Sequence, residues 1–350
     1  MHLIRRTLLG ATTLLTFGAA AVSAGAAGPT LPQTAAASSA ATWLSTQLTP
    51  GDYIAGANPG TADLAATVNT LLALAATGTD PTGAQTGLKY MEHHQAGYVK
   101  ANGSNGPGQV SLLILLAHAL GVSPTDFGGT NLVAELMATE QSTGRFGTQS
   151  QVNDYNSGPY DQGLALAALA AAGDQLGTSA LPVTWLQAQQ CADGGWTDPS
   201  KALNPCDGSP ADFAGPDTNT TAVAVEGLVA QSGGLTTTVS KKVLTFFESA
   251  QDSDAGWSYD PNSAADPQTT DPDSTSLVLQ ALVAMKVSPT SARFTKSGAT
   301  PVSTLLTFQI TSGADTGAIS FTAGGTTGDL LSTYQTVPAL AGLAIPYTAP

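Results

Sequence analysis

The sequence predicts an all-α protein in which six pairs of helices curl into a closed ring, an α6/α6 toroid. A unit of two helices joined by a glycine–aromatic loop recurs along almost the whole chain. The second helix of each unit is apolar on nearly every face, which is typical of a helix in an interior. The last unit is as apolar as the middle ones, whereas an open stack of repeats needs polar ends. A ring has no ends to protect.

The first residues indicate export. Arg5 and Arg6 precede an apolar run that is too short to span a bilayer comfortably, and small residues follow it. We expect residues 1–27 to be a signal peptide cleaved after Sec or Tat export, and residues 28–39 to be a flexible linker. An uncleaved amphipathic anchor is the alternative. Residues 40–350 are expected to form one monomeric, secreted domain of six repeats without a further transmembrane segment.

Composition excludes some classes of partner. The chain carries 25 acidic and 11 basic side chains, a formal charge of −14, whereas nucleic-acid and anionic-membrane surfaces need clustered Lys and Arg. A hydrophobic content of 42% with only 10% charged residues is not a disordered composition. The 4 Trp, 8 Tyr and 9 Phe are few for 350 residues, which matters for any cavity that must stabilise a carbocation.

The repeated loop is clearest in WLQAQQCADGGW and FFESAQDSDAGW. Each places a Gln six residues before a Trp, Gln190 before Trp196 and Gln251 before Trp257. The Gln amide can satisfy carbonyls at a helix end and in a neighbouring loop, while the aromatic ring packs across the joint between repeats. Less regular copies pair Gln47 with Tyr53 and Gln141 with Phe146, and degenerate copies end at Tyr98 and Phe321.

The apolar second helices follow these loops in step. They are expected over residues 62–76, 109–120, 160–172, 219–230, 274–285 and 332–343. The first helices are amphipathic, so that Lys241 and Glu248 can face water while Val243 and Phe247 face inward. Five inner helices carry an acid near the start, where it can cap the helix and complement its dipole. These acids are Asp63, Asp161, Asp217, Asp273 and Asp329.

The QCADGGW and QDSDAGW loops resemble the QW-type repeats of the squalene/hopene cyclase and protein prenyltransferase superfamily. The resemblance covers almost the whole chain after the expected signal peptide, and it implies an α/α toroid in a secreted bacterial member. The superfamily includes enzymes as well as non-catalytic binders such as cobalamin carriers. The resemblance therefore indicates the fold and leaves the activity open.

The resemblance implies one catalytic candidate. Squalene-type cyclases protonate an alkene with the middle acid of an Asp-x-Asp-Asp motif, and the nearest segment here is Asp271-Pro272-Asp273-Ser274. Asp273 would be the general acid, but Ser274 replaces the second neighbouring Asp, and a strong acid needs supporting partners. Capping of the following helix by Asp273 or Ser274 explains the same residues.

Cofactors and metals are not expected. Cys191 and Cys206 lie in one loop region, and no His is spaced to complete the zinc site that the resemblance to prenyltransferases would imply. We expect them to form a disulfide, with two separate thiols as the alternative. The pair His93–His94 and the acidic loops lack the spacing of a metal site.

Three functions remain open. The favoured one is a secreted, non-catalytic protein that binds a small apolar or amphipathic ligand, or an envelope component, in the toroid cavity or at its rim. The second is a terpene cyclase-like enzyme that uses Asp273 in a deep aromatic pocket. The third is an extracellular polysaccharide lyase or hydrolase built on the cluster Asp154–Tyr155 and Tyr160–Asp161. Residues expected to contact a ligand are Tyr155, Tyr160, Asp161, Phe213, Asp217, Asp271 and Tyr334.

Overall fold

The structure is a computed structural model. It describes residues 31–101, 104–147, 158–177, 179–197, 206, 215–231, 233–262 and 269–350. Within these ranges the regular secondary structure is helical apart from one two-stranded sheet, β1 (Lys100–Ala101) with β2 (Ser104–Asn105), and isolated bridges; turns and loops connect the helices. The all-α prediction is confirmed. The expected signal peptide, residues 1–27, lies outside the described residues.

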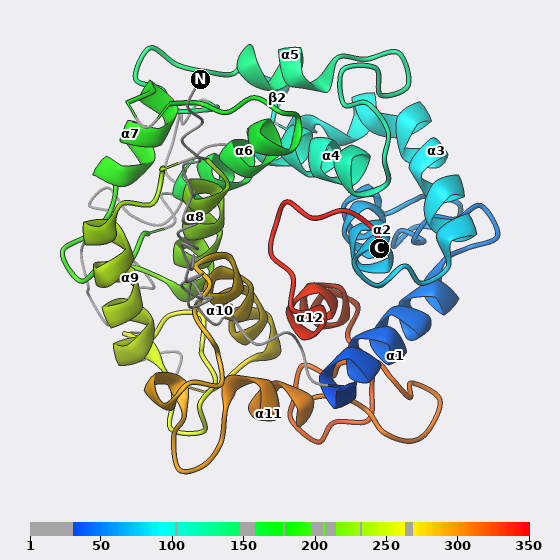
Figure 1. Ribbon diagram of the computed structural model, residues 1–350. Coiled ribbons are helices and arrows are strands. Elements are labelled where there is room, and N and C mark those ends of the chain that lie inside the picture. The colour runs from blue at the N-terminus through cyan, green and yellow to red at the C-terminus, as the bar shows by residue number, and fades with distance from the viewer. Residues whose placement is uncertain are drawn as a thin grey trace, which may run out of the picture.

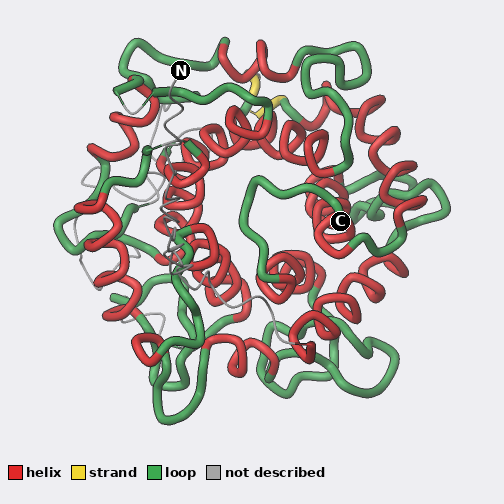
Figure 2. Tube along the Cα trace, viewed as in Figure 1, coloured by secondary structure: helices red, strands yellow, loops and turns green. Residues whose placement is uncertain are grey.

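Six apolar helices form the inner layer (Figures 1 and 2). They are α2 (Leu64–Thr77), α4 (Pro107–Ala119), α6 (Pro159–Ala171), α8 (Thr218–Ala230), α10 (Pro272–Ala284) and α12 (Leu330–Ala341). Each contacts the next one along the chain, and α12 contacts α2. Each begins within two residues of its predicted start. Small Ala side chains alternating with Leu and Val allow these helices to pack closely on both sides.

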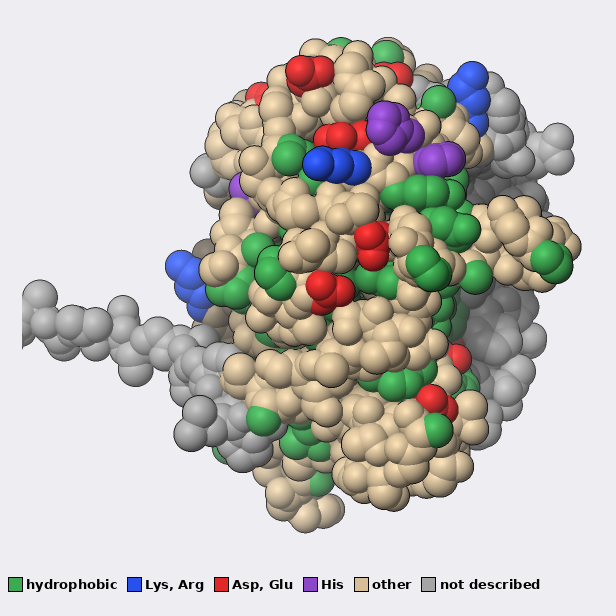
Figure 3. Space-filling view, turned by 90° about the vertical axis from the view of Figure 1, so that its right-hand side faces the viewer, with side chains coloured by type: hydrophobic (Ala, Val, Ile, Leu, Met, Phe, Trp, Pro, Cys, Tyr) green, Lys and Arg blue, Asp and Glu red, His purple; other side chains and the backbone are tan. Residues whose placement is uncertain are grey.

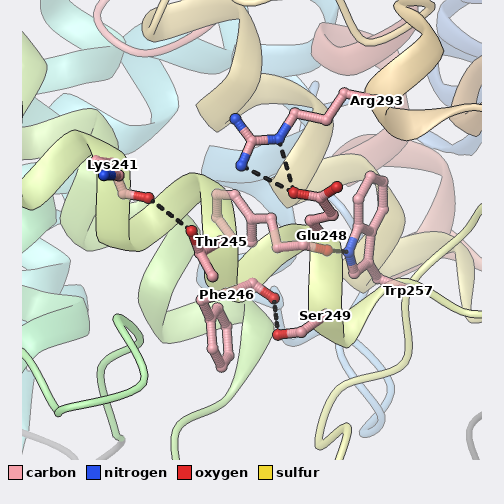
Figure 4. Close-up of polar contacts among 8 residues, drawn as sticks. Lys241, Thr245, Phe246, Glu248, Ser249, Trp257 and Arg293 are labelled. Atoms are coloured by element: carbon pink, nitrogen blue, oxygen red, sulfur yellow. Dashed lines mark hydrogen bonds and ion pairs between the residues drawn. The ribbon is translucent and has the colours of Figure 1, made fainter.

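A second set of helices forms the outer layer (Figure 1). They are α1 (Leu31–Gln47), α3 (Pro81–Tyr98), α5 (Leu132–Met137), α7 (Leu181–Ala188), α9 (Thr237–Ala250) and α11 (Pro301–Leu306), with a 3-10 turn, η1 (Ala292–Phe294). On α9, Val243 and Phe247 are buried whereas Lys241 and Glu248 are exposed, as their spacing predicts. Glu248 forms a surface ion pair of 2.9 Å with Arg293 (Figure 4).

Helix α1 corrects the expected linker. Residues 31–39, nine of the twelve assigned to a flexible linker, are helical. Ala36 and Ala37 are buried in a cluster that includes Leu305 and Leu340. The Pro, Ala and Ser content of this segment favours a linker. Ala has the highest helix propensity, however, and packing of α1 on α12 stabilises the helix.

The two tryptophan joints have the same geometry. Trp196 and Trp257 are fully buried, and each indole Nε1 donates a 2.8 Å hydrogen bond to the carbonyl ten residues earlier in the outer helix. These carbonyls belong to Leu186 and Phe247; Figure 4 labels Trp257 beside the end of α9. Each joint therefore fixes a loop to the outer helix that precedes it.

Three glutamines link neighbouring outer segments. The Nε2 of Gln251 donates to Ala255 O at 2.9 Å and to Phe294 O at 2.8 Å. Gln190 and Gln309 also donate both within their own loops and to the next outer helix, and for Gln309 that helix is α1. Gln47 and Gln141 donate within their own segments instead. Of their aromatic partners, Phe146 is buried and Tyr53 stacks on Tyr90.

The segment after α12 crosses the barrel. It leaves α12 through Gly342, whose positive φ of 71° turns the chain, and it lies over the middle of the ring (red in Figure 1). The Tyr347 hydroxyl donates to Leu72 O at 3.2 Å, and Ala349 N donates to Ala119 O at 2.9 Å. The segment therefore contacts the inner wall of the barrel on α2 and α4.

The Sγ atoms of Cys191 and Cys206 lie 2.00 Å apart, at disulfide distance. Among the described residues, no helix combines the length and apolarity needed to cross a bilayer. On the face drawn in Figure 3, charged side chains and His are few and lie among uncharged ones. This face has no extended basic patch.

Candidate functional site

Carboxylates stand at the starts of four inner helices. Asp63, Asp217, Asp271 and Asp329 are the N-caps of α2, α8, α10 and α12. Each side chain accepts a hydrogen bond of 2.7–2.9 Å from the backbone N–H three residues later. Asp271 therefore takes the capping role that the sequence assigned to Asp273 or Ser274. Pro at the first helical position is the physical reason, since it favours a cap immediately before it.

Asp273 is thus free for another role. It lies half-buried in the first turn of α10. Burial raises the pKa of its carboxyl to about 7; the charges of Asp271 and Asp329 add to this, and the Ser332 hydroxyl opposes it. Its Oδ1 is buried and accepts no hydrogen bond from the described residues. At neutral pH this carboxyl exists in both its protonated and its ionised form.

Asp273 lies in the wall of a cleft of about 560 Å³. We call this space the Asp273 cleft; its lining includes Asp254, Asp271, Asp273, Tyr259, Phe308 and Phe321. Phe321 is 58% exposed, which is unusual for so large an apolar side chain. The volume falls within the roughly 300–1,000 Å³ of small-molecule sites. The cleft therefore combines ring surfaces with carboxyl groups in a space of ligand size.

Hydrogen bonds fix the acidic side of this cleft. The Thr270 hydroxyl donates to Asp254 Oδ1 at 2.5 Å and to Asp252 Oδ2 at 3.1 Å. Burial raises the pKa of Asp252 to about 6, an effect that the Thr270 hydroxyl opposes. No group of three or more His, Cys, Asp or Glu within the described part of the chain is arranged to hold a metal ion.

A second group of candidate residues lines the middle of the barrel. An inner cavity of about 80 Å³ is bounded by Leu72, Tyr160, Glu226, Tyr334, Ile345 and Tyr347, among others. Burial raises the pKa of Tyr334 to about 12, and that of Tyr160 above its usual range. Both phenols therefore stay protonated and can donate hydrogen bonds.

The structure separates the predicted ligand residues into two groups. Asp271 lies in the Asp273 cleft, whereas Tyr160 and Tyr334 line the inner cavity. Asp217 is a buried helix cap. Asp161 lies in the first turn of α6, close against the start of α4. The remaining predicted residues, Asp154, Tyr155 and Phe213, lie outside the described residues.

Two features of the inner helices were not predicted. The first is a Thr four residues after each capping Asp: the hydroxyls of Thr67, Thr221, Thr275 and Thr333 each accept a backbone N–H from the preceding loop. The repeated Asp-x-x-x-Thr spacing was the available signal. The second is Glu226, a buried carboxyl on α8. Its signal was a single charge inside an otherwise apolar helix.

Comparison with known proteins identifies the fold. The type II terpene cyclase MstE from Scytonema (apo) aligns with a TM-score of 0.58 at 15% identity, over 89% of this chain and 98% of that one. A protein from Actinoplanes aligns with a TM-score of 0.60 at 15% identity, covering 89% and 99%. An inactive α-1,6-mannanase variant of Salegentibacter sp., in complex with α-1,6-mannotriose, gives 0.57 at 10% identity, covering 89% and 98%. No family model and no curated protein matches the sequence. The chain therefore shares the helical fold of type II terpene cyclases, and identities this low show the fold alone.

Proposed function

We propose that this protein is an exported, closed toroid of six QW-type helix pairs that binds a small amphipathic ligand in the Asp273 cleft. The carrying observation is the cleft's lining, which joins the exposed ring of Phe321 to the carboxyls of Asp271 and Asp273. Apolar parts of a ligand would pack on the rings, and its donor groups would meet the carboxyls. The amino-terminal Arg5–Arg6 pair and apolar run support export.

The volumes of the Asp273 cleft and of the inner cavity favour a ligand site at the rim of the barrel over one at its centre. The Asp273 cleft holds about 560 Å³, whereas the inner cavity holds about 80 Å³. The smaller value lies well below the roughly 300 Å³ at which small-molecule sites begin. The segment after α12 contributes Ile345 and Tyr347 to the inner cavity and reduces its space. A ligand of ordinary size therefore has room at the rim while this segment is in place.

Acid catalysis at the same cleft is the second candidate. It is supported by Asp273, whose carboxyl has a pKa of about 7 and a buried oxygen that no described residue occupies. A protein with a similar fold binds a prenylated molecule: one solved MstE complex contains geranylgeranyl dihydroxybenzoate. Two observations disfavour protonation of an alkene. Ser274 stands at the position of the second motif acid. A carboxyl with a pKa near 7, as Asp273 has, is also a weak acid for that reaction.

A binding titration tests the first proposal. The fluorescent probe N-phenyl-1-naphthylamine has two aromatic ring systems and one N–H donor, so it matches the cleft. Phe321→Ala should weaken its binding at least about fivefold, because ring contact is lost. Leu331→Ala is the matched control, since Leu331 is an exposed apolar side chain that is not part of the cleft lining. Equal affinities for the wild type and Phe321→Ala would contradict the proposal.

Product analysis separates binding from catalysis. Wild type and Asp273→Asn are incubated with geranylgeranyl dihydroxybenzoate, and the extract is examined by mass spectrometry and NMR. The binding proposal expects the substrate to be recovered unchanged from both. A cyclised product that appears with the wild type and disappears with Asp273→Asn would replace it with the acid-catalysis candidate.

A further inference from the structure

We infer that residues 343–350 form a displaceable plug of the barrel centre, latched by Glu226, and that the space beneath takes an apolar molecule with a hydrogen-bond donor. This site is separate from the Asp273 cleft. The two have no lining residue in common, and the inference does not depend on the function proposed for that cleft.

The plug is held at three points on three inner helices. Ile345 N donates to Glu226 Oε2 on α8 at 2.9 Å. The Tyr347 hydroxyl donates to a carbonyl of α2, and Ala349 N donates to a carbonyl of α4. Figure 1 shows the segment reaching over the middle of the ring without forming a helix or strand. Three of its hydrogen-bond donors are therefore bonded to acceptors of the barrel wall.

Glu226 is an unusual residue for that wall. It is 1% exposed, and its second oxygen, Oε1, is buried and receives no hydrogen bond from the described residues. Gln335 Oε1, which belongs to a residue lining the same cavity, is also buried without a described donor. Buried acceptors without donors are unfavourable in an apolar interior. The site therefore has acceptor capacity that residues 343–350 leave unused.

The walls around these acceptors are made by the helices themselves. Leu72, Leu112, Leu164, Val223 and Leu277 line the cavity from five different inner helices. They form a ring of apolar side chains whether or not the plug is present. Of the plug itself, Tyr347 is buried, whereas residues 343–346 are only half-buried. Removal of the plug leaves a preformed apolar pocket rather than a collapsed core.

The plug indicates the chemistry of its replacement. It brings uncharged apolar side chains, Ile345 and Tyr347, together with two N–H donors and one O–H donor aimed at acceptors of the wall. A molecule with an apolar body and an N–H or O–H group satisfies the same requirements. It can also donate to Glu226 Oε1, which the plug does not reach.

Hydrogen exchange on the intact protein is the first test. A displaceable plug opens locally, so the amides of Ile345 and Ala349 should exchange at a rate that low concentrations of urea do not change. The buried amides of α6 should exchange only through global unfolding. Glu226→Leu should speed exchange at Ile345 by about tenfold or more, and Glu226→Gln, which keeps an acceptor, should speed it less. Exchange of residues 343–350 only through global unfolding would overturn the inference.

A deletion variant gives the second test. The chain shortened after Gly342 should bind the peptide Leu343–Pro350 added in trans. It should also bind one more molecule of N-phenyl-1-naphthylamine than the full chain, and the peptide should displace that molecule. Phe321→Ala in both backgrounds weakens the cleft site, so failure of the cleft proposal and failure of this one are distinguishable. A folded deletion variant, verified by circular dichroism, that binds neither probe would refute the inference; if the deletion does not fold, the exchange result alone decides.

Discussion

Glu226 and Asp273 show how single carboxyls can mark sites in a protein with few charges. Glu226 is buried and Asp273 is half-buried, and burial raises the pKa of each carboxyl: to about 8 for Glu226 and to about 7 for Asp273. Each retains a buried oxygen that no described residue occupies. Burial of an ionisable group without a charge partner is unfavourable, so such a residue in an otherwise apolar helix indicates a requirement other than stability.

The pKa of Glu226 makes a prediction about stability. Its ordinary value is 4.5 and its folded value is about 8, so between these pH values the folded state holds a proton that the unfolded state has lost. Stability therefore falls as pH rises through this window. Glu226→Gln removes that loss and should raise the Tm at pH 8 by roughly 3 °C or more, with little change near pH 5.

Thermal denaturation at both pH values checks this. Glu248→Gln is the control, because Glu248 is an exposed acid in a surface ion pair. A Glu226→Gln variant whose Tm follows that of the wild type in parallel at pH 5 and pH 8 would show that Glu226 ionises in the folded protein as it does in water.

At the scale of the element, four inner helices, α2, α8, α10 and α12, begin with a small hydrogen-bonded unit. Asp271 caps α10, and four residues later the Thr275 hydroxyl accepts from Trp257 N at 3.0 Å and donates to Trp257 O at 3.3 Å. The same arrangement recurs with Asp217, Thr221 and Trp196. The unit joins the aromatic loop to the start of the inner helix, and so positions the wall of the Asp273 cleft.

Removal of one hydroxyl tests that unit. Thr275→Val leaves the buried N–H of Trp257 without its acceptor, and should lower the free energy of unfolding by about 1–3 kcal/mol. Thr275→Ser keeps the hydroxyl, and should retain most of the stability that the valine variant loses. Urea denaturation monitored by tryptophan fluorescence measures both. A valine variant as stable as the wild type, with the loss confined to the serine variant, would show that the methyl group, not the hydrogen bond, matters.

Most of the helices could be predicted from the sequence, but not all of the contacts between them. The starts of the inner helices followed from apolar runs, whose periodicity is local. The prediction of Asp273 or Ser274 as the cap of α10 is wrong by two or three residues, although Pro272 favours Asp271 as the cap. The role of Glu226 could not be predicted, because its partner Ile345 lies 119 residues away and is brought near only by the fold. The Asp273 cleft likewise joins residues from separate loops.

At the scale of the whole molecule, the first and last helix pairs meet through specific bonds. Trp43 Nε1 of α1 donates to Asp315 Oδ1 at 3.2 Å, and Gly328 N donates to Asp315 Oδ2 at 2.9 Å. Gln309 Nε2 donates to Ala36 O at 2.8 Å. Together with the contact between α12 and α2, these bonds join the two ends of the described chain.

Asp315→Ala should weaken this junction selectively. It leaves two donors without their acceptor, so α1 should become less protected from hydrogen exchange by about tenfold, while α6, on another part of the ring, should be unaffected. Asp315→Asn keeps one carbonyl acceptor, so exchange of α1 in this variant should be faster than in the wild type and slower than in Asp315→Ala. Unchanged exchange of α1 in Asp315→Ala would show that packing alone holds the ends together.

The most direct measurement is a crystal structure of the protein with N-phenyl-1-naphthylamine bound at a concentration near its Kd. We expect the probe to occupy the Asp273 cleft, with a ring against Phe321 and its N–H toward the carboxyl of Asp271 or Asp273. A full-length structure in which the cleft is empty and the probe lies elsewhere on the molecule would contradict it.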